Sequence, residues 1–362
     1  MQAIEDLDTP SVLIDLDKTE RNIARMAERA NAAGVALRPH GKTHKVPEVA
    51  RMQLRAGAKG ITLAKVGEAE VFVDAGIDDI FLAYPIVGAV KARRLLALAD
   101  KARLAVGADS EAGAQSLSDV FAKAGRKLDV RLKVDVGFHR VGVLPEAARA
   151  LAEKIAAMPG LRFSGVFTHA GQGYHCDTED GLAEVGKHEA ETLSAVAREL
   201  RAAGLNCEAV SVGSTPTAIH AMRADVTEAR PGTYVYYDAT QTNLGLCTLD
   251  DCAISVLATV VSVPAPDRAV LDCGSKMLSS DPLRPKPVAH GFIVGRESRV
   301  QRLSEEHGVV AVAPGESFRV GDRVQVIPNH ACVVSNLQDH VHAVRKGCVE
   351  AIWPVAARGK VL

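Results

Sequence analysis

Short runs rich in β-branched residues alternate with longer amphipathic stretches between Val35 and Asp238, and this alternation constrains the fold more than any other feature. It is the pattern of parallel strands joined by crossover helices. Such units predict an α/β fold, a (β/α)₈ TIM-type barrel whose chemistry collects at the C-terminal ends of the strands; a doubly wound open sheet is the alternative. The eight predicted strands cover residues 35–40, 60–64, 79–85, 103–109, 129–136, 162–170, 207–213 and 228–238.

After Leu249 the sequence changes to apolar, β-branched runs without long helical periods. This texture predicts an antiparallel β domain, so we expect residues 1–248 to form the barrel domain and residues 249–362 the β domain. The strands predicted there cover residues 254–263, 268–272, 291–294, 309–312, 323–327 and 342–344.

Composition excludes two classes of partner. The 43 basic residues nearly balance the 44 acidic ones in a chain of 362 residues, which leaves no charge pattern for nucleic acid or an anionic membrane. No apolar run reaches membrane-spanning length, and the start of the chain lacks a signal-peptide pattern. The seven scattered cysteines are not spaced as a disulfide framework. We therefore expect a cytoplasmic protein that binds a small molecule.

The first predicted strand ends in the basic segment Leu37-Arg-Pro-His-Gly-Lys-Thr-His-Lys45. A lysine that is close to other cations and partly desolvated has a lowered pKa and can form a Schiff base with an aldehyde. Lys42 is closest to the strand end, so we assign it this role. The alternative is a solvated basic loop.

Glycines and hydroxyl residues follow the last two predicted barrel strands. They occur in Val210-Ser-Val-Gly-Ser-Thr-Pro-Thr217 and in Arg230-Pro-Gly-Thr-Tyr234. Barrels often bind phosphate at this place, through backbone N–H groups and short helix N-termini. Ordinary turns would have the same composition, so the segments indicate a phosphate site only in combination with the barrel.

Three further side chains follow the fifth and sixth predicted strands. Arg140 and His169 could each contact the ring of a bound cofactor, the arginine by donating to a phenolic oxygen. Tyr174 is a candidate acid, base or stacking partner. A structural ion pair for the arginine and a packing role for the tyrosine are the alternatives.

His330 and Cys332 are two residues apart in Ile327-Pro-Asn-His-Ala-Cys332. On a strand this spacing directs both side chains to one face, as a metal site requires. One imidazole and one thiolate suit Zn²⁺ and leave positions open for substrate or water. The alternative is a pair of core residues.

Several longer motifs, in this order, resemble the fold-type III pyridoxal-phosphate (PLP) enzymes of the D-serine dehydratase and D-threonine aldolase family. The resemblance runs nearly end to end. The motifs are Leu7-Asp-Thr-Pro-Ser, Arg38-Pro-His-Gly-Lys-Thr-His-Lys, Thr168-His-Ala-Gly, Ser211-Val-Gly-Ser-Thr-Pro-Thr, Pro231-Gly-Thr-Tyr-Val-Tyr-Tyr-Asp, Glu306-His-Gly and Pro328-Asn-His-Ala-Cys.

The resemblance implies an alanine-racemase-like barrel with a C-terminal β domain, assembled as a homodimer. It implies Lys42 as the Schiff-base residue and His330 with Cys332 as ligands of a divalent metal, with Zn²⁺ favoured and Mn²⁺ or Mg²⁺ as alternatives. The phosphate ligands that it implies are Ser214, Thr215, Thr217, Gly232, Thr233 and Tyr234.

The implied substrate is a D-β-hydroxy-α-amino acid, and two reactions are open. Loss of the α-proton and of the β-hydroxyl would dehydrate D-serine or D-threo-3-hydroxyaspartate, whereas cleavage of the Cα–Cβ bond would be an aldolase reaction on D-threonine. Thr168-His-Ala-Gly and His330-Ala-Cys332 resemble the dehydratase branch; Ser335-Asn-Leu and Trp353-Pro-Val-Ala-Ala-Arg-Gly resemble the aldolase branch. We favour dehydration.

Two rival functions and one rival lysine follow from the same features. A racemase would use the barrel and the lysine without the metal pair. A non-catalytic PLP carrier would consist of the barrel alone, which the β-rich segment after Leu249 argues against. Lys276, in Asp272-Cys-Gly-Ser-Lys-Met, is the second candidate for the aldehyde-binding lysine.

Overall fold

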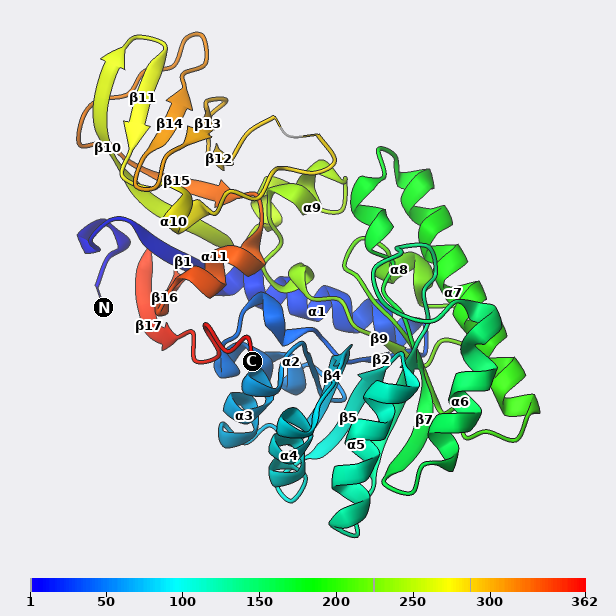
Figure 1. The fold of residues 1–362 in the computed structure, drawn as a ribbon. Coiled ribbons are helices and arrows are strands. Elements are labelled where there is room, and N and C mark those ends of the chain that lie inside the picture. Colours follow the sequence, from blue (N-terminus) through cyan, green and yellow to red (C-terminus); the bar gives the residue numbers. More distant parts are fainter. Residues whose placement is uncertain (1, 224, 287) are drawn as a thin grey trace.

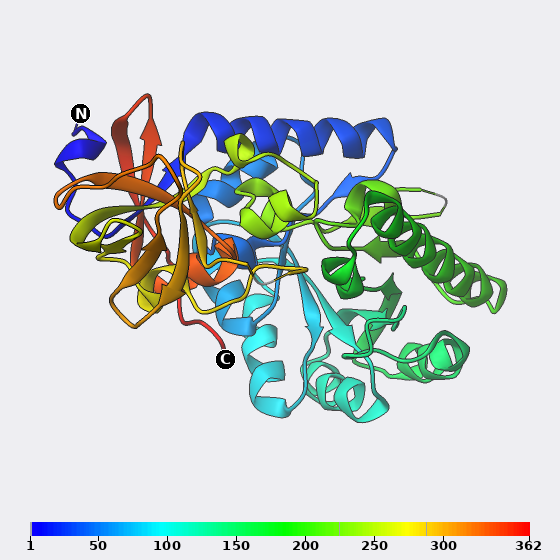
Figure 2. The same cartoon turned by 90° about the horizontal axis from the view of Figure 1, so that it is seen from above.

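The computed structural model describes residues 2–223, 225–286 and 288–362, which form a barrel with a β domain at one side (Figures 1 and 2). Across these residues eight strands form the parallel sheet of the barrel, and a bridge between His40 and Thr62 joins its two end strands. The predicted barrel is thus confirmed, and the open sheet is excluded. In sheet order the strands are β2 (Ala36–Leu37), β9 (Glu228–Ala229), β8 (Ala209–Val212), β7 (Leu161–Phe167), β6 (Leu128–Lys133), β5 (Arg103–Ala108), β4 (Asp79–Pro85) and β3 (Ile61–Leu63).

Helices cover the outside of the barrel, and their ends follow local sequence. The Asp15 carboxylate accepts a hydrogen bond from Lys18 N at the start of the first helix, and Pro47 opens the second, where a missing N–H costs nothing. The helices are α1 (Leu16–Ala32), α2 (Pro47–Arg55), α3 (Val66–Asp74), α4 (Ala89–Leu98), α5 (Glu111–Lys123), α6 (Ala148–Ala157) and α7 (Glu179–Ala202), with the short α8 (Ala218–Ala221) and α9 (Ala239–Asn243). None of the described helices is long and apolar enough to span a bilayer.

The second sheet is mainly antiparallel, as expected, and includes one strand from the start of the chain. This strand, β1 (Ser11–Asp15), lies between β10 and β16, although residues 1–248 were assigned to the barrel. Its partners are far along the chain, so no local pattern indicated the pairing. The other strands are β10 (Ile254–Ala265), β11 (Arg268–Leu271), β12 (Gly291–Ile293), β13 (Arg299–Leu303), β14 (Gly308–Ala311), β15 (Arg323–Pro328), β16 (His340–Arg345) and β17 (Cys348–Pro354), with helices α10 (Ser275–Leu278) and α11 (Ala331–Leu337).

Two local predictions were wrong. The last barrel strand was expected to reach Asp238, but β9 ends at Ala229, because proline and glycine follow at 231 and 232 and a 3₁₀ turn, η5 (Thr233–Val235), begins. His330 and Cys332 were expected on a strand; β15 instead ends at Pro328, and the pair opens α11.

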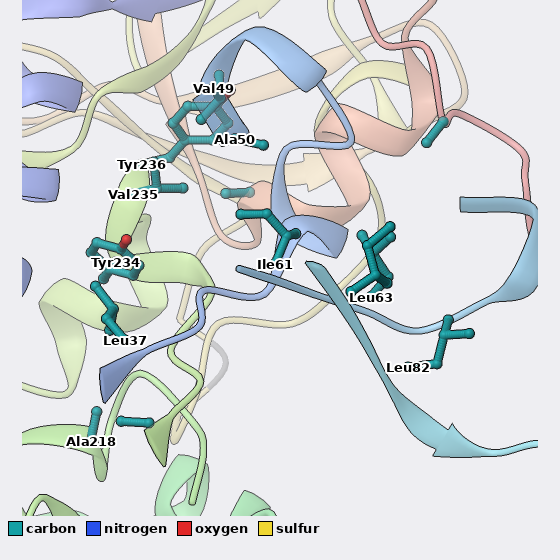
Figure 3. Packing of buried hydrophobic residues seen from close by; sticks show 14 of the residues in the cluster. Leu37, Val49, Ala50, Ile61, Leu63, Leu82, Ala218, Tyr234, Val235 and Tyr236 are labelled. Atoms are coloured by element: carbon teal, nitrogen blue, oxygen red, sulfur yellow. The ribbon is translucent and has the colours of Figure 1, made fainter. Parts of the chain in front are cut away.

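The barrel core packs against α2 and the segment after β9. Figure 3 shows Ile61 and Leu63 of β3 with Val49 of α2 and the buried Tyr234 and Tyr236 nearby. This packing fixes the backbone on which the 3₁₀ turn η2 (Gly41–Thr43) stands, at the C-terminal end of β2.

Burial of His44 makes stability depend on pH. Its Nδ1 accepts a hydrogen bond from Val46 N at 3.1 Å, and burial lowers the pKa of the imidazole to about 4. The folded pKa lies below the unfolded value of about 6.5, so the unfolded chain binds the extra proton between these pH values. We expect His44 to remove about 3 kcal/mol of unfolding free energy as the pH falls from 6.5 to 4.

Urea unfolding at several pH values checks this prediction. His44→Asn should give a flatter pH dependence below 6.5, whereas His307→Asn, at an exposed position, should retain the wild-type dependence. Equal slopes in all three proteins would contradict it.

Candidate active site

A cavity of about 380 Å³ opens at the C-terminal ends of the barrel strands. A second cavity, of about 240 Å³, extends toward the β domain. Lys42, Arg140, His169 and Tyr174 line both, so the two are adjoining parts of one site, which we call the inner and the outer cavity. Predicted site residues from six segments of the chain, at positions 42, 140, 169–174, 214–215, 232–233 and 330, therefore line this site.

Lys42 lies in η2, on the rim of the site. Its backbone N–H donates to Nδ1 of His40 at 3.3 Å, and its side chain enters both cavities. Burial, together with the neighbouring Lys42 and Arg230, lowers the pKa of His40 well below its usual range. Within the described parts of the chain, no hydrogen bond or ion pair engages the Lys42 amine, so it is available to a ligand.

Lys276 does not reach the site. It is exposed in α10 and forms ion pairs with Glu305 and Glu306 at 3.1 and 2.5 Å. Of the two lysines considered from sequence, only Lys42 lines a cavity.

The inner cavity has a cradle of small residues, Ser214, Thr215, Gly232 and Thr233. The Thr215 hydroxyl accepts hydrogen bonds from Gly232 N and Tyr234 N, both at 3.2 Å. A Cβ on Gly232 would lie 2.8 Å from Thr43 Oγ1, so only glycine fits. Backbone N–H groups, hydroxyls and a close glycine are the features that hold a phosphate group, so these residues fit one.

Two of the predicted phosphate ligands do not line the cavity. The Thr217 hydroxyl donates to Glu189 at 2.9 Å, and the Tyr234 hydroxyl accepts from Gln53 Nε2 at 3.1 Å. Both side chains are buried behind the cradle. They fix its backbone, and Tyr234 is positioned to contribute through its main chain alone.

His169 lies beside the inner cavity in a defined tautomer. Its Nδ1 is 2.6 Å from Gly213 O, so Nδ1 carries the proton and Nε2 keeps its lone pair. Burial, with Lys42, Lys133 and Arg140 nearby, lowers the pKa of His169 well below its usual range. The neutral ring is packed edge-on against Phe138 at 5.8 Å, and can contact a planar ligand.

Arg140 and Tyr174 complete the shared wall. The Arg140 guanidinium lies over the Phe138 ring, 4.7 Å from its centroid. Burial, and the nearby Cys332 and Asp238, raise the pKa of the Tyr174 phenol, while hydrogen bonds with Thr233 and Gln241 lower it only in part. Tyr174 is therefore protonated at neutral pH and can donate a proton.

Sequence reasoning missed two cations in the inner cavity. Lys133 ends β6, where burial and the neighbouring Arg230 lower the pKa of its amine well below the usual range. Arg230, just after β9, donates hydrogen bonds to Ser211 Oγ and Thr168 O. Both lie at the C-terminal ends of the observed strands β6 and β9 but inside the predicted strands 129–136 and 228–238, so the sequence did not place them at strand ends.

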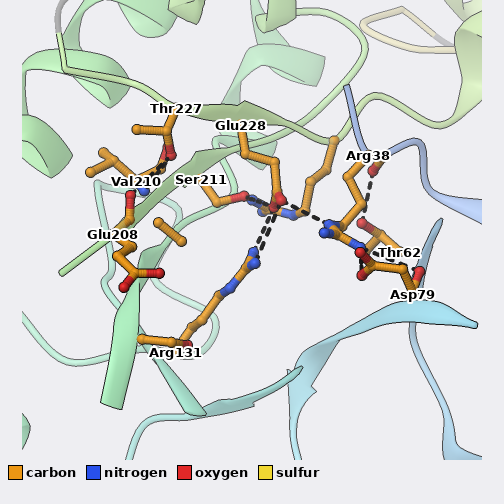
Figure 4. Close-up of polar contacts among 12 residues, drawn as sticks. Arg38, Thr62, Asp79, Arg131, Glu208, Val210, Ser211, Thr227 and Glu228 are labelled. Atoms are coloured by element: carbon orange, nitrogen blue, oxygen red, sulfur yellow. Dashed lines mark hydrogen bonds and ion pairs between the residues drawn. The ribbon is translucent and has the colours of Figure 1, made fainter. Parts of the chain in front are cut away.

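A buried ion-pair network supports the cavity from below (Figure 4). Glu228 accepts hydrogen bonds from Arg38 at 2.7 Å, Arg131 at 2.6 Å and Ser211 at 2.6 Å. Burial alone would raise the pKa of Glu228. The positive charges of Arg131 and Arg38 have the larger effect and hold this pKa far below the usual range. The network holds Ser211, and through it Arg230, in place.

Next to the outer cavity, His330 and Cys332 meet the barrel. Nδ1 of His330 is 2.6 Å from Asp281 Oδ2, and Cys332 Sγ is 3.3 Å from Thr43 Oγ1, one residue from Lys42. Burial raises the pKa of Cys332, but His330 and Lys42 outweigh it and lower the pKa overall, which favours a thiolate.

The donor set suits a divalent metal. An imidazole held by a carboxylate presents its other nitrogen, and a thiolate lies two residues away. Within the described ranges, no group of three or more His, Cys, Asp or Glu side chains is arranged to hold a metal ion, so the metal site rests on this pair alone. Sequence reasoning missed Asp281 because it is far from the pair along the chain.

Two family models match this architecture. "Alanine racemase, N-terminal domain" matches residues 14–240, and "Putative serine dehydratase domain" matches residues 253–344. The chain therefore belongs to the alanine-racemase-like barrel enzymes, and within them to those with a serine-dehydratase β domain.

Relatives define the family more closely. D-threo-3-hydroxyaspartate dehydratase of Delftia sp. (strain HT23) is 38% identical over 90% of this chain and 91% of the relative. D-threonine aldolase of Arthrobacter sp is 37% identical over 98% of this chain and 93% of the relative. The chain thus belongs to the lyase family that contains D-serine dehydratase and D-threonine aldolase, as the sequence motifs indicated.

Solved structures of relatives have the same fold as this chain. D-threonine aldolase from Filomicrobium marinum superposes with a TM-score of 0.93, at 33% identity, over 100% of this chain and 98% of that chain. Two solved variants of a D-threo-3-hydroxyaspartate dehydratase each have alanine in place of one residue, a histidine in one and a cysteine in the other, at positions two apart. The cysteine variant is in a metal-free form.

Proposed function

We propose that this chain is a PLP- and divalent-metal-dependent lyase that dehydrates D-β-hydroxy-α-amino acids, with D-serine or D-threo-3-hydroxyaspartate as the type of substrate. The observation that carries the proposal is the convergence of a free lysine, a phosphate-sized cradle and an imidazole–thiolate pair on one site. The family relationship supports it, because the relatives are lyases of such substrates.

Lys42 would hold PLP, with the phosphate against Ser214, Thr215, Gly232 and Thr233. The bound cofactor supplies an electron sink for the bonds of the substrate α-carbon. Arg140 and His169 would contact the ring, the latter through its neutral imidazole.

The outer cavity would hold the β-hydroxyl. His330 and Cys332 would bind the metal there; we propose Zn²⁺, with Mn²⁺ or Mg²⁺ as alternatives. Lys42 and Tyr174 line both cavities, so the amine or the phenol would exchange a proton with the substrate close to the reacting carbons. The protonated Tyr174 is suited to deliver a proton to the leaving hydroxyl.

The imidazole–thiolate pair favours dehydration. The two solved dehydratase variants show that this relative has a histidine and a cysteine at the same spacing, and the variant without the cysteine is in a metal-free form. Aldol cleavage is the second candidate, because D-threonine aldolase relatives match the chain over its whole length.

Products from D-threonine test the choice. We expect the metal-loaded holoenzyme to release ammonia and 2-oxobutanoate in equal amounts, measured by a coupled dehydrogenase assay. Glycine with acetaldehyde would establish the aldolase instead. Racemisation without either product, and without a need for metal, would support the racemase.

Glu189 is expected to control cofactor affinity through the cradle. Its carboxylate, buried in α7, accepts from Gly213 N at 3.1 Å, Thr217 Oγ1 at 2.9 Å and Ala170 N at 3.3 Å. Losing these contacts in Glu189→Ala should weaken PLP binding roughly 10- to 100-fold, measured by fluorescence titration of the apoprotein.

Glu189→Gln is the matched control, because its carbonyl oxygen can still accept from both backbone N–H groups, and its affinity should stay within about threefold of wild type. If Glu189→Ala bound PLP with wild-type affinity, the hydrogen bonds of the Glu189 carboxylate would not be needed to hold the cradle in shape.

We further propose a homodimer, with the rim of the site at the subunit contact. Tyr84, Val87, Val141 and Leu144 are large apolar side chains exposed around the inner cavity or in the loops next to it. Such a patch is typical of an interface. Light scattering should give twice the mass of the chain.

Cytoplasmic location remains a prediction from composition.

A further inference from the structure

The outer cavity contains two carboxylates, and both are already engaged. The Asp281 carboxylate is held by His330. Asp238 accepts from Gln241 N at 3.0 Å through one oxygen and from Ala331 N at 2.9 Å through the other. Among the described residues, neither carboxylate forms an ion pair with a further cation that lines the same cavity.

Arg284 is such a cation. It lines the outer cavity next to Asp281 and His330, and its side chain is exposed. No hydrogen bond or ion pair among the described residues engages its guanidinium group. The one hydrogen bond of this residue in that set is made by its carbonyl oxygen, which accepts from Asn243 Nδ2 at 2.7 Å.

The loop that carries Arg284 is anchored at two points. Besides the Asn243 contact, the Asp281 carbonyl accepts from Asn329 Nδ2 at 3.1 Å, which ties the loop to the segment before His330. Arg284, Asp281 and His330 all line the outer cavity, so this anchored loop holds Arg284 beside the space that His330 borders.

The position corresponds to one part of the substrate. With the α-carbon at the cofactor in the inner cavity and the β-hydroxyl at His330, the remaining β-substituent extends into the outer cavity. A guanidinium there presents two parallel N–H donors that can bind a carboxylate as the β-substituent. It cannot form such hydrogen bonds with a hydrogen atom or a methyl group at that position.

We propose that Arg284 determines specificity by binding a β-carboxylate, so that the preferred substrate class is the dicarboxylic D-3-hydroxyaspartate type rather than D-serine or D-threonine. The inference rests on the proposed function and goes further by selecting among its substrates. Arg284 contacts only the distal carboxylate and has no part in breaking a bond.

Binding of unreactive ligands tests the proposal. D-aspartate and D-alanine both lack the β-hydroxyl, and they differ by the distal carboxylate; each is titrated against the holoenzyme by the change in visible absorbance. In Arg284→Gln the Kd of D-aspartate should rise about 10- to 100-fold, while that of D-alanine is unchanged. Arg284→Lys keeps the positive charge but loses the two parallel N–H donors, so its Kd for D-aspartate should lie between those of the wild type and Arg284→Gln.

Arg268→Gln, an exposed arginine of β11 outside both cavities, is the control and should bind both ligands as wild type does. Turnover should agree: Arg284→Gln should raise KM for D-threo-3-hydroxyaspartate and leave the kinetics with D-serine unaltered. Equal effects on both ligands, or no change in D-aspartate affinity, would overturn the proposal. Failure of the proposed function is distinct, because wild-type enzyme would then release no product from any D-β-hydroxy amino acid.

Discussion

Lys42→Ala should lose the visible absorbance of the bound cofactor and nearly all activity. The Lys42 amine is the one lysine nitrogen that borders both cavities, and the described residues leave it unpaired. Removing a covalent group of this kind typically lowers kcat by several orders of magnitude, and we expect roughly 10⁴-fold or more. Absorbance spectra and single-turnover rates measure the two losses separately.

Lys133 is the critical control, because it lines the same inner cavity with a lowered amine pKa. Lys133→Met should keep the visible absorbance. Borohydride reduction of the wild-type holoenzyme, followed by peptide mass mapping, should place the cofactor mass on the peptide with Lys42. Label on Lys133 or Lys276, or absorbance retained in Lys42→Ala, would refute the assignment.

The barrel was predictable because its signals are local. Each strand–helix unit shows a run of β-branched residues, a helix stripe and a proline or glycine at an end, as at Pro47. The position of Lys42 beside the cavity was predictable for the same reason, because this lysine closely follows a β-rich run. The pairing of β1 with β10 and β16 could not be found in this way, because strand partners distant in sequence leave no local pattern.

The supporting residues of the site were missed for the same reason. Glu189 in α7 reads as an ordinary helical acid until the fold brings it to Gly213. Asp281 lies in a loop, and only the folded chain places it against His330. Sequence likewise could not tell that the Tyr234 side chain faces the core, because a two-residue β9 gives no alternation to follow.

His330→Ala or Cys332→Ala should leave the visible absorbance intact and remove metal-dependent turnover. Cys332 Sγ lies 3.3 Å from Thr43 Oγ1 and 3.9 Å from Thr233 Oγ1 of the phosphate cradle. The hydrogen bonds that join Thr215 to Gly232 and Tyr234 do not involve the pair, so the cofactor should still bind after either substitution. A Lewis acid supplies several kcal/mol of stabilisation to a departing hydroxyl, so kcat should fall about 100- to 1000-fold. Metal content and ammonia release, measured before and after chelation, give the result.

Asp281→Asn should lower turnover less than Cys332→Ala does, because it weakens metal binding without removing a metal ligand. The carboxylate fixes the His330 imidazole at 2.6 Å and directs its other nitrogen toward the thiolate side. Losing such a partner typically weakens metal binding 10- to 100-fold, so excess metal should restore most of the turnover of Asp281→Asn but none of that of Cys332→Ala. Cys348→Ser, which removes a thiol in β17, should behave as wild type. Undiminished ammonia release by Cys332→Ala after chelation would refute the metal role. Metal-independent racemisation without ammonia release would instead favour a racemase, because proton exchange at the α-carbon needs no Lewis acid at the β-hydroxyl.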